Sequence, residues 1–387
     1  MRFLHISDLH LGRQLHRFPL QEEQDEILEH IRRIAAEHKP DAVLIAGDVY
    51  DKSIPPVYAM QSLDRFLSGL LATGATVCMI SGNHDSADRI GFLSGPLKQG
   101  RLYVSPSYQG TVEPVTLHDA HGPVDIWLLP FLKPAMVRPF FPDEEIADTN
   151  SAVACAIRHL PIRPERRNVL IAHQFVAGSK LIGSEDACAL GLPGDIAVGG
   201  TDLVDARHFS AFDYVALGHL HHPQNVGSSR IRFCGTPLTY SFAEIGSDKS
   251  VTLVELSGDR SLSVEEIPLP EPRHMQELRG SFAEITAPPS VALTDRDAYT
   301  HIILTDDHPI PDVLTRLRQY YPNITHLSWD NRRTSIDMDF SASADASTQT
   351  PLSVFADFFL RANGSALSAE QEQYMDALIR SIWEVAE

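Results

Sequence analysis

The sequence is poor in cysteine, in long apolar runs and in positive charge. Its 387 residues include four cysteines, at positions 78, 155, 188 and 234, and no two of them form a CxxC pair. This scatter argues against a disulfide framework and a thiolate zinc site, and it fits a reduced cytosolic compartment. No apolar run approaches the roughly 18 residues of a membrane span, and "MRFLHISDLHLG" contains no apolar signal segment.

The 32 lysines and arginines stand against 51 acidic residues, which gives a net charge of −19. Nucleic-acid binding depends largely on basic surface, so this balance argues against such a partner unless bound cations reverse the sign locally. Two arginine clusters are local exceptions, although each can equally be ordinary solvated surface: Arg13 with Arg17, and Arg163 with Arg166 and Arg167. A nucleic-acid function must therefore rest on a particular site.

Hydrophobic residues make up 43% of the chain and, to about residue 260, alternate between strand and helix patterns. Helical spacing is found over residues 21–38 and 57–73, the second helix ending at Gly74. Strands are predicted in the tract 111–131 and in the apolar runs "RFLHISD", "DAVLIAGD", "TVCMISG", "NVLIAHQ" and "DYVALGHLHH". Apolar strands separated by helices indicate an α/β core whose strands are buried on both faces.

The proline-rich segment "IPLPEPRH", residues 267–274, predicts a domain boundary. We expect a catalytic core over 1–270, a small α+β cap over 271–340, and a linker with C-terminal helices over 341–387. In the cap, "YTHIILTD", a helix around 311–321 and "ITHLSW" predict a β-α-β unit. The Ser/Ala/Thr-rich stretch 341–350 is typical of a flexible linker.

Two helices are predicted after this linker, over 351–362 and 368–386. Ser368 and Gln371 have the spacing of a capping box at the start of the second helix. Apolar residues form one stripe along that helix, after Phe355, Phe358 and Phe359 in the first: Tyr374, Met375, Leu378, Ile379, Ile382 and Trp383. The stripe can either dock on a partner or pack on the chain's own domain.

Five predicted strands end in side chains that can bind metals: Asp8 with His10, Asp48, Asn83 with His84 and Asp85, His173, and His219 with His221. The carboxyl ends of strands meet at one edge of an α/β sheet. Residues i and i+2 of an extended chain point the same way, so Asp8 and His10 can face one centre. The sequence therefore predicts a polar site at this edge.

These oxygen and imidazole ligands are too many for one ion and suit two, and they favour Mn²⁺, iron or Zn²⁺ over Ca²⁺. Two ions about 3.5–4 Å apart clamp the attacking and leaving oxygens of a phosphoryl displacement. Asp48, whose carboxylate has two oxygens, is the candidate bridge. A single histidine such as His173 can also be an ordinary core residue, and we assign that role to His5, His16, His30, His118, His208 and His222.

The motifs resemble those of the calcineurin-like metallophosphoesterases, and more narrowly those of the SbcD family of bacterial double-strand-break repair nucleases. They are "SDLHLG" (7–12), "AGDVYDKSIPP" (46–56), "GNHDS" (82–86), "IAHQFVAG" (171–178), "ALGHLHHPQ" (216–224) and "FCGTPLTYSF" (233–242). The resemblance implies a two-sheet α/β sandwich with a small α+β capping domain that binds DNA and a C-terminal helical tail.

The resemblance also implies a role for each site residue. One metal would be held by Asp8, His10, Asp48 and His221, and the second by Asp48, Asn83, His173 and His219, with Asp48 bridging. His84 would act on the phosphate and the leaving group, with Asp85 orienting it. Asp51 departs from the pattern, because some relatives carry there a histidine that handles substrate, so nucleotide positioning stays open.

The implied activity is a Mn²⁺-dependent DNA nuclease of repair, recombination and replication: an ATP-dependent 3′-to-5′ exonuclease on duplex ends and an endonuclease on single strands or hairpins. Its C-terminal helices would bind SbcC, an SMC-like coiled-coil ATPase. A homodimer through helices near 57–72 and 86–99, within a heterotetramer, is implied likewise, with a nucleoid-associated cytoplasmic location.

Two alternatives are open. The acidic net charge favours a phosphatase or a cyclic-nucleotide phosphodiesterase on the same fold. A scaffold that has lost catalysis would lack some ligands, whereas all seven and His84 are present here.

Overall fold

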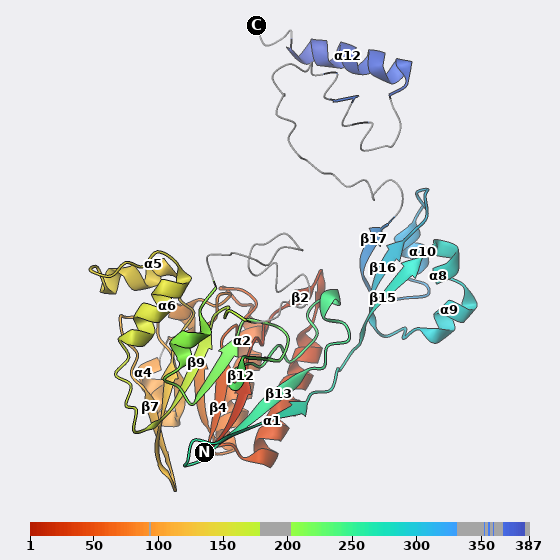
Figure 1. Cartoon of the computed structure of the whole chain (residues 1–387). Helices are drawn as coiled ribbons and strands as arrows, with labels where there is room; N and C mark the ends of the chain where they lie inside the picture. The colour runs from red at the N-terminus through yellow and green to blue at the C-terminus, as the bar shows by residue number, and fades with distance from the viewer. Residues whose placement is uncertain are drawn as a thin grey trace. The chain divides into compact units, whose positions relative to one another are not determined.

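The computed structural model describes residues 1–92, 94–178, 203–330, 352, 355–356, 359 and 367–383. The chain divides into two compact units, Met1–Arg273 and His274–Glu387, so the division falls within the predicted proline-rich segment (Figure 1). The predicted third part, 341–387, belongs to the second unit. Its linker, most of the predicted helix 351–362 and Cys188 lie outside the described residues.

Two six-stranded sheets form the centre of the first unit. One has the order β14-β13-β1-β4-β5-β6, with strands β1 (Arg2–Ile6), β4 (Ala42–Ala46), β5 (Thr76–Ile80), β6 (Leu102–Val104), β13 (Ser250–Leu256) and β14 (Leu262–Pro268). The other has the order β11-β12-β10-β9-β8-β7, with strands β7 (Val115–Asp119), β8 (Gly122–Leu128), β9 (Arg167–His173), β10 (Tyr214–Gly218), β11 (Gln224–Val226) and β12 (Ser228–Phe233). Strands β1, β4, β5 and β6 run parallel, as do β8, β9, β10 and β12.

A hydrophobic core joins the facing surfaces of the two sheets. Leu44 and Ile80 come from the first sheet, and Ile126, Ile171 and Ala216 come from the second; all five are fully buried. Every residue of β4, β5, β9 and β10 is buried, which is why these strands are nearly continuous apolar runs in the sequence. The predicted two-sheet sandwich is confirmed.

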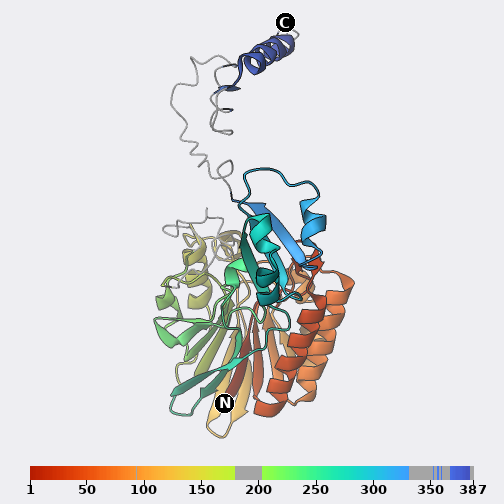
Figure 2. The ribbon, with the colours of Figure 1, turned by 90° about the vertical axis from the view of Figure 1, so that its right-hand side faces the viewer.

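Two long helices, α1 (Gln21–His38) and α2 (Val57–Ala72), run side by side next to the first sheet (red and orange in Figure 2). Ile27 and Ile31 of α1 and Phe66 of α2 are among the residues that they bury. The chain leaves α2 through Gly74, whose φ of +97° suits glycine. Both helices were predicted correctly to within one residue.

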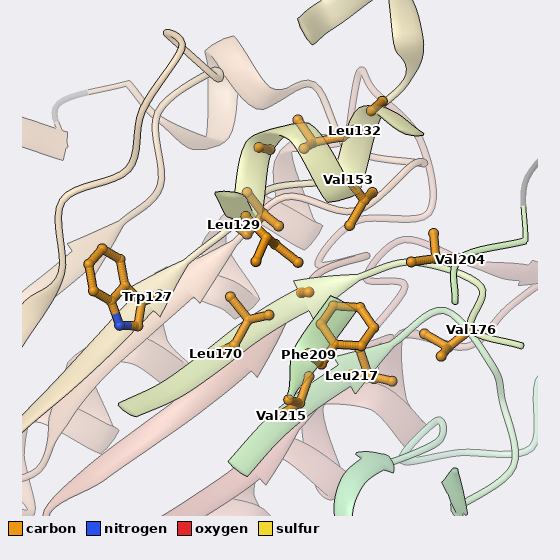
Figure 3. Packing of buried hydrophobic residues seen from close by; sticks show 14 of the residues in the cluster. Trp127, Leu129, Leu132, Val153, Leu170, Val176, Val204, Phe209, Val215 and Leu217 are labelled. Atoms are coloured by element: carbon orange, nitrogen blue, oxygen red, sulfur yellow. The ribbon is translucent and has the colours of Figure 1, made fainter. Parts of the chain in front are cut away.

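Shorter helices cover the second sheet: α5 (Pro134–Val137), η2 (Arg138–Phe140), α6 (Thr149–Arg158) and η3 (Ala206–Phe209). Figure 3 shows Val153 of α6 and Phe209 of η3 gathered with Leu170 and Leu217 of the sheet. The sheets and their helices therefore form four layers. Cysteines 78, 155 and 234 are buried free thiols within these layers.

The remaining elements of the first unit are short. They are the ribbon of β2 (Gln14–Leu15) and β3 (Phe18–Pro19), the helices α3 (Ala87–Ile90) and α4 (Ser94–Leu97), and the 3-10 turns η1 (Lys98–Gly100) and η4 (Phe242–Glu244). The turn η4 lies in the segment between β12 and β13, directly after the "GTPLTYS" motif.

The second unit contains a three-stranded parallel sheet of β15 (Met275–Gly280), β16 (Tyr299–Leu304) and β17 (Ile324–Trp329). Three short helices accompany it: α8 (Phe282–Ile285), α9 (Pro288–Leu293) and α10 (Val313–Leu317). Ile302, Leu304 and Leu317 lie in its core. The predicted β-α-β unit is therefore present, extended by one strand.

The C-terminal helix α12 (Ala369–Trp383) begins at the predicted capping box. The Ser368 backbone N–H donates to Gln371 Oε1 at 2.9 Å, and the Gln371 N–H donates to Ser368 Oγ at 3.3 Å. Tyr374 is 69% exposed on this helix. Among the described residues, none of the helices has the length and apolar character needed to span a membrane.

Candidate metal centre

The predicted ligands lie at the carboxyl ends of parallel strands from both sheets. They follow β1 (Asp8, His10), β4 (Asp48), β5 (Asn83) and β10 (His219, His221), or end β9 (His173). His173 Nδ1 lies 2.8 Å from the Ala46 carbonyl oxygen, which joins the ends of β9 and β4 across the two sheets. Six of the seven side chains are buried, and Asn83 is half-buried. The fold thus gathers all seven at one rim.

The backbone at four of these residues is in the left-handed region, which side chains rarely adopt. The φ angles are +52° at Asp8, +42° at His10, +46° at Asp48 and +107° at His219. Backbone hydrogen bonds hold two of these turns, from Asp8 N to Gly47 O at 3.1 Å and from His10 N to Asp48 O at 2.9 Å. Such conformations cluster at functional sites, where they aim side chains at a common point.

Asp8, His10 and His221 form the first set of possible ligands, with one donor atom from each within 4.8 Å of the others. Both ring nitrogens of His10 are buried, and neither finds a hydrogen-bond partner among the described residues. An unsatisfied buried imidazole is costly unless something else binds it. These atoms therefore fit a bound cation.

A second set surrounds His173. Its Nε2 lies 3.3 Å from Asp48 Oδ2 and 3.0 Å from Asn83 Oδ1, and the same Asn83 oxygen lies 3.1 Å from His219 Nδ1. Asp48 Oδ2 is also 3.8 Å from His10 Nε2 in the first set. Asp48 therefore lies between the two sets, in the position that a bridging carboxylate needs.

The charges of the centre depend on burial and on close pairs. Burial raises the pKa of Asp8 to about 6 and holds the pKa of His10 well below its usual value. Burial, with His173 nearby, lowers the pKa of His219 to about 3. His10 and His219 are thus neutral imidazoles near pH 7, the form that binds metals.

Asp48 and His173 shift in opposite senses. Burial disfavours both charged forms, yet their mutual attraction outweighs it: the pKa of His173 rises to about 9, and the pKa of Asp48 falls below its usual range. Asp48 therefore favours positive charge beside it, which either a proton on His173 or a divalent cation can supply.

His84 is half-buried at the edge of the centre. Its backbone N–H donates to Asp48 Oδ1 at 2.9 Å, and its ring meets the His10 ring edge-on at 4.9 Å. Ring atom Nδ1 lies 2.9 Å from the Asp51 carbonyl oxygen. The backbone of Asp51 is thus the group that orients His84.

This contact corrects the role expected for Asp85. Its carboxylate accepts backbone N–H groups of Val49 at 3.0 Å, Tyr50 at 2.9 Å and Gly82 at 2.9 Å. Asp85 therefore holds together the loops after β4 and β5 and does not orient the His84 ring. Burial, with Asp48 nearby, raises its pKa to about 6.

Two glycines leave room for the ligands. A Cβ at Gly82 would lie 2.1 Å from Asp48 Oδ1, and one at Gly218 would lie 2.0 Å from the Ala46 carbonyl oxygen and 2.7 Å from His173 Nδ1. These distances are far below van der Waals contact, so a side chain at either position would displace the ligands.

Three supporting residues were not among the predicted site residues. Tyr240 donates its hydroxyl to the Leu9 carbonyl, and its ring meets the His10 ring at 5.6 Å. Gln24 donates to the His10 carbonyl at 2.8 Å. Glu244 lies beside His221. The "GTPLTYSF" motif contains Tyr240 and ends two residues before Glu244, so it was a signal for this support.

Histidines that were assigned structural roles make contacts of that kind. His5 Nδ1 pairs with the Tyr214 hydroxyl at 2.8 Å, and His208 Nε2 pairs with Asn150 Oδ1 at 3.0 Å. His222, next to the centre in sequence, has its Nδ1 2.9 Å from Ser247 Oγ.

Comparison with known proteins places this site in a family. Residues 1–223 match the model of the calcineurin-like phosphoesterases. Residues 271–363 match a second model, described as the type 5 capsule protein repressor C-terminal domain of SbcD.

Two curated relatives cover most of the chain. The SbcD subunit of the nuclease SbcCD from Staphylococcus epidermidis is 30% identical over 331 residues, which are 85% of this chain and 85% of the relative. The protein of the same name from Staphylococcus saprophyticus is 31% identical over 331 residues, 85% of this chain and 84% of the relative. A solved structure, that of TT1561 from Thermus thermophilus, aligns with 68% of this chain and 98% of its own at 11% identity and a TM-score of 0.37.

Proposed function

Because the chain belongs to the SbcD family of calcineurin-like phosphoesterases, we propose that it is a metal-dependent nuclease that hydrolyses DNA phosphodiesters. The observation that carries the proposal is the gathering of seven ligand candidates around Asp48. The relatives that match both units of the chain are nuclease subunits.

Two divalent cations, in our proposal Mn²⁺, occupy the centre. Asp8, His10 and His221 hold one, Asn83, His173 and His219 hold the other, and Asp48 bridges them. The donor set of carboxylate, amide oxygen and imidazole without thiolate supports this choice, although it also suits Mg²⁺, iron or Zn²⁺. Bound there, the two ions would polarise the phosphodiester and supply a nucleophilic water at neutral pH.

His84 acts on the scissile phosphate. As an imidazolium it carries a proton on both nitrogens: Nδ1 donates to the Asp51 carbonyl, which leaves the Nε2 proton for a phosphate oxygen or the leaving oxygen. The half-buried position lets a large substrate reach the ring. Asp85 supports this step indirectly, because it holds the loop that carries His84.

The partner assignment is part of the same proposal. The relatives are named as subunits of SbcCD, which supports binding of the coiled-coil ATPase SbcC through the C-terminal helices. We propose that ATP use by SbcC gates 3′-to-5′ duplex exonuclease and hairpin endonuclease activities in DNA repair, recombination and replication. The second unit contacts the DNA, and the complex works in the cytoplasm at the nucleoid.

Homodimerisation within a heterotetramer is supported by exposed apolar residues. Ile54 and Val57 are 69% exposed, Met60 is 51% exposed and Phe92 is 70% exposed. Arg89 of α3 donates to the Ser53 carbonyl at 3.1 Å, which brings the segment before Phe92 to the start of α2. Such a patch on a soluble protein marks an interaction surface.

A phosphatase or a cyclic-nucleotide phosphodiesterase is the second candidate. The net charge of −19 favours it, because an acidic chain repels long polyanions. The match of residues 271–363 to a family-specific C-terminal domain weighs against it.

The deciding experiment is cleavage of a linear duplex and a DNA hairpin by the purified chain with Mn²⁺. It is run with and without SbcC and ATP, beside Asp48→Asn and with a simple phosphodiester as a second substrate. We expect Mn²⁺-dependent DNA cleavage that SbcC stimulates and Asp48→Asn abolishes. Hydrolysis of the simple diester without any DNA cleavage would favour the second candidate.

A further inference from the structure

A buried ion pair lies directly behind one of the candidate ligands. Glu244, at the end of η4, is 2% exposed, and its Oε1 lies 3.1 Å from His221 Nδ1. Its other oxygen, Oε2, accepts hydrogen bonds from Lys249 Nζ and, at 3.1 Å, from Thr236 Oγ1. Lys249 is itself only 6% exposed. Burying an acid and a base is costly, so the fold keeps this carboxylate against a penalty.

The network closes on His221. Lys249 Nζ donates to Thr236 Oγ1 at 2.8 Å, and the Thr236 backbone N–H donates to the His221 carbonyl at 3.1 Å. The Glu244 carboxylate is therefore fixed from one side by Lys249 and Thr236. Its remaining oxygen can reach His221 without moving either partner.

A carboxylate accepts hydrogen bonds and cannot donate them. The His221 nitrogen that faces Glu244, Nδ1, must therefore carry the hydrogen, and the ring lone pair then lies on Nε2. His221 offers a donor atom within 4.8 Å of those of Asp8 and His10. Glu244 thus selects the tautomer in which Nε2 can bind a metal in the first set.

The second set of ligands shows a different kind of support among the contacts that the structure describes. His173 Nδ1, the ring nitrogen opposite the one that faces Asp48, contacts a neutral group, the Ala46 carbonyl oxygen at 2.8 Å. Hydrogen bonds to a charged acceptor are stronger, and a carboxylate behind an imidazole raises its basicity as a ligand. The two metal sets therefore differ in their support.

We propose that Glu244 is a positioning residue that fixes the orientation and strengthens the ligand character of His221, and so sets the affinity of the Asp8–His10–His221 site for its cation. Lys249 holds the carboxylate in place. The inference rests on the proposed metal function of His221. A carboxylate that served folding alone would leave metal affinity unchanged.

The test uses variants of the full chain that separate the carboxylate from the buried charge. Glu244→Gln alone would leave Lys249 buried and uncompensated, so the informative pair is Lys249→Met and the double variant Glu244→Gln/Lys249→Met. The control is Asp119→Asn. It removes a carboxylate from the ion pair with Arg167, which lies at the opposite end of β9 from His173.

The measurement is Mn²⁺ binding by titration calorimetry and by electron paramagnetic resonance. We expect one of the two sites to bind Mn²⁺ about 10- to 100-fold more weakly in the double variant than in Lys249→Met, with the other site unchanged. Asp119→Asn should bind like the wild type. Equal affinities at both sites in the double variant and in Lys249→Met would overturn the proposal.

Folding is checked by circular dichroism. If the double variant does not fold, Glu244→Asp replaces it, because aspartate keeps the charge for Lys249 but withdraws the oxygen from His221 by one methylene. Wild-type affinity in a folded Glu244→Asp would also overturn the proposal. Loss of affinity in the variants of a wild type that cleaves no DNA would leave this inference standing and remove the proposed function.

Discussion

At the scale of single residues, the centre depends on where two neighbouring side chains of one loop point. Asn83 directs its amide oxygen to His173 and His219, whereas His84 turns to the Asp51 carbonyl at the edge of the centre. Adjacent residues thus divide between binding a cation and contacting the substrate. The division gives a prediction for His84 that differs from that for any ligand.

Replacement of His84 by alanine should lower DNA cleavage about 10²–10⁴-fold while the chain still binds two Mn²⁺ ions, because the ring supplies a proton and no metal contact. The rate is measured on a linear duplex, and metal content is measured by mass spectrometry. His118→Ala, an exposed histidine of β7, is the matched control and should match the wild type. Cleavage by His84→Ala at the wild-type rate would contradict the role proposed for His84.

At the scale of elements, the C-terminal helix α12 carries an aromatic side chain that a helix packed on its own domain would cover. Tyr374 is 69% exposed, and Leu378, one turn further along the same stripe, is 39% exposed. Aromatic residues are frequent anchors of protein interfaces, where truncation of one costs about 2 kcal/mol or more. The helix therefore fits a partner groove.

We expect Tyr374→Ser to weaken binding of SbcC by roughly 30-fold or more, without changing the cleavage of a simple phosphodiester by the isolated chain. Affinity is measured by titration of the two purified proteins. Gln373→Ser, an exposed neighbour on the same helix, is the control and should bind normally. An unchanged affinity for Tyr374→Ser would assign the stripe to the chain's own packing.

At the scale of the whole molecule, the exposed apolar patch of Ile54, Val57, Met60 and Phe92 distinguishes a monomer from a dimer. A symmetric pair would bury the same patch on both copies, so one substitution changes the interface twice. Charge at its centre is unfavourable only when the patch is buried. The oligomeric state therefore tests whether the patch is an interface.

The wild type should sediment as a dimer at micromolar concentration, and Val57→Asp/Met60→Asp should sediment as a monomer that still binds Mn²⁺. Analytical ultracentrifugation measures both. Met136→Asp, which places a carboxylate at a 45%-exposed methionine of α5, is the control and should stay dimeric. A wild-type monomer, or a dimeric double variant, would exclude this patch as the interface.

Much of the fold and of the centre could be predicted from local patterns. The apolar runs of β4, β5, β9 and β10, the period of α1 and α2, and the capping box of α12 each depend on residues that are close in sequence. The ligand candidates followed from the rule that such strands present polar residues at their carboxyl ends. Local spacing was therefore enough to find them.

The supporting contacts could not be predicted in this way, because their partners are far apart in sequence and depend on loop conformation. Asp85 binds the backbone of Val49 and Tyr50, and so does not orient the adjacent His84. The ring of His84 is held by a backbone carbonyl, and a carbonyl has no sequence signature.

The sequence by itself determined the kind of chemistry: an α/β core, ligand candidates at strand ends and a set of atoms suited to divalent cations. The tertiary structure alone decided how those atoms combine, because the two sheets must pack before His173 reaches Asp48 and before Glu244 reaches His221. Composition and period report which residues are buried. The distances between buried polar atoms depend on packing across the whole unit.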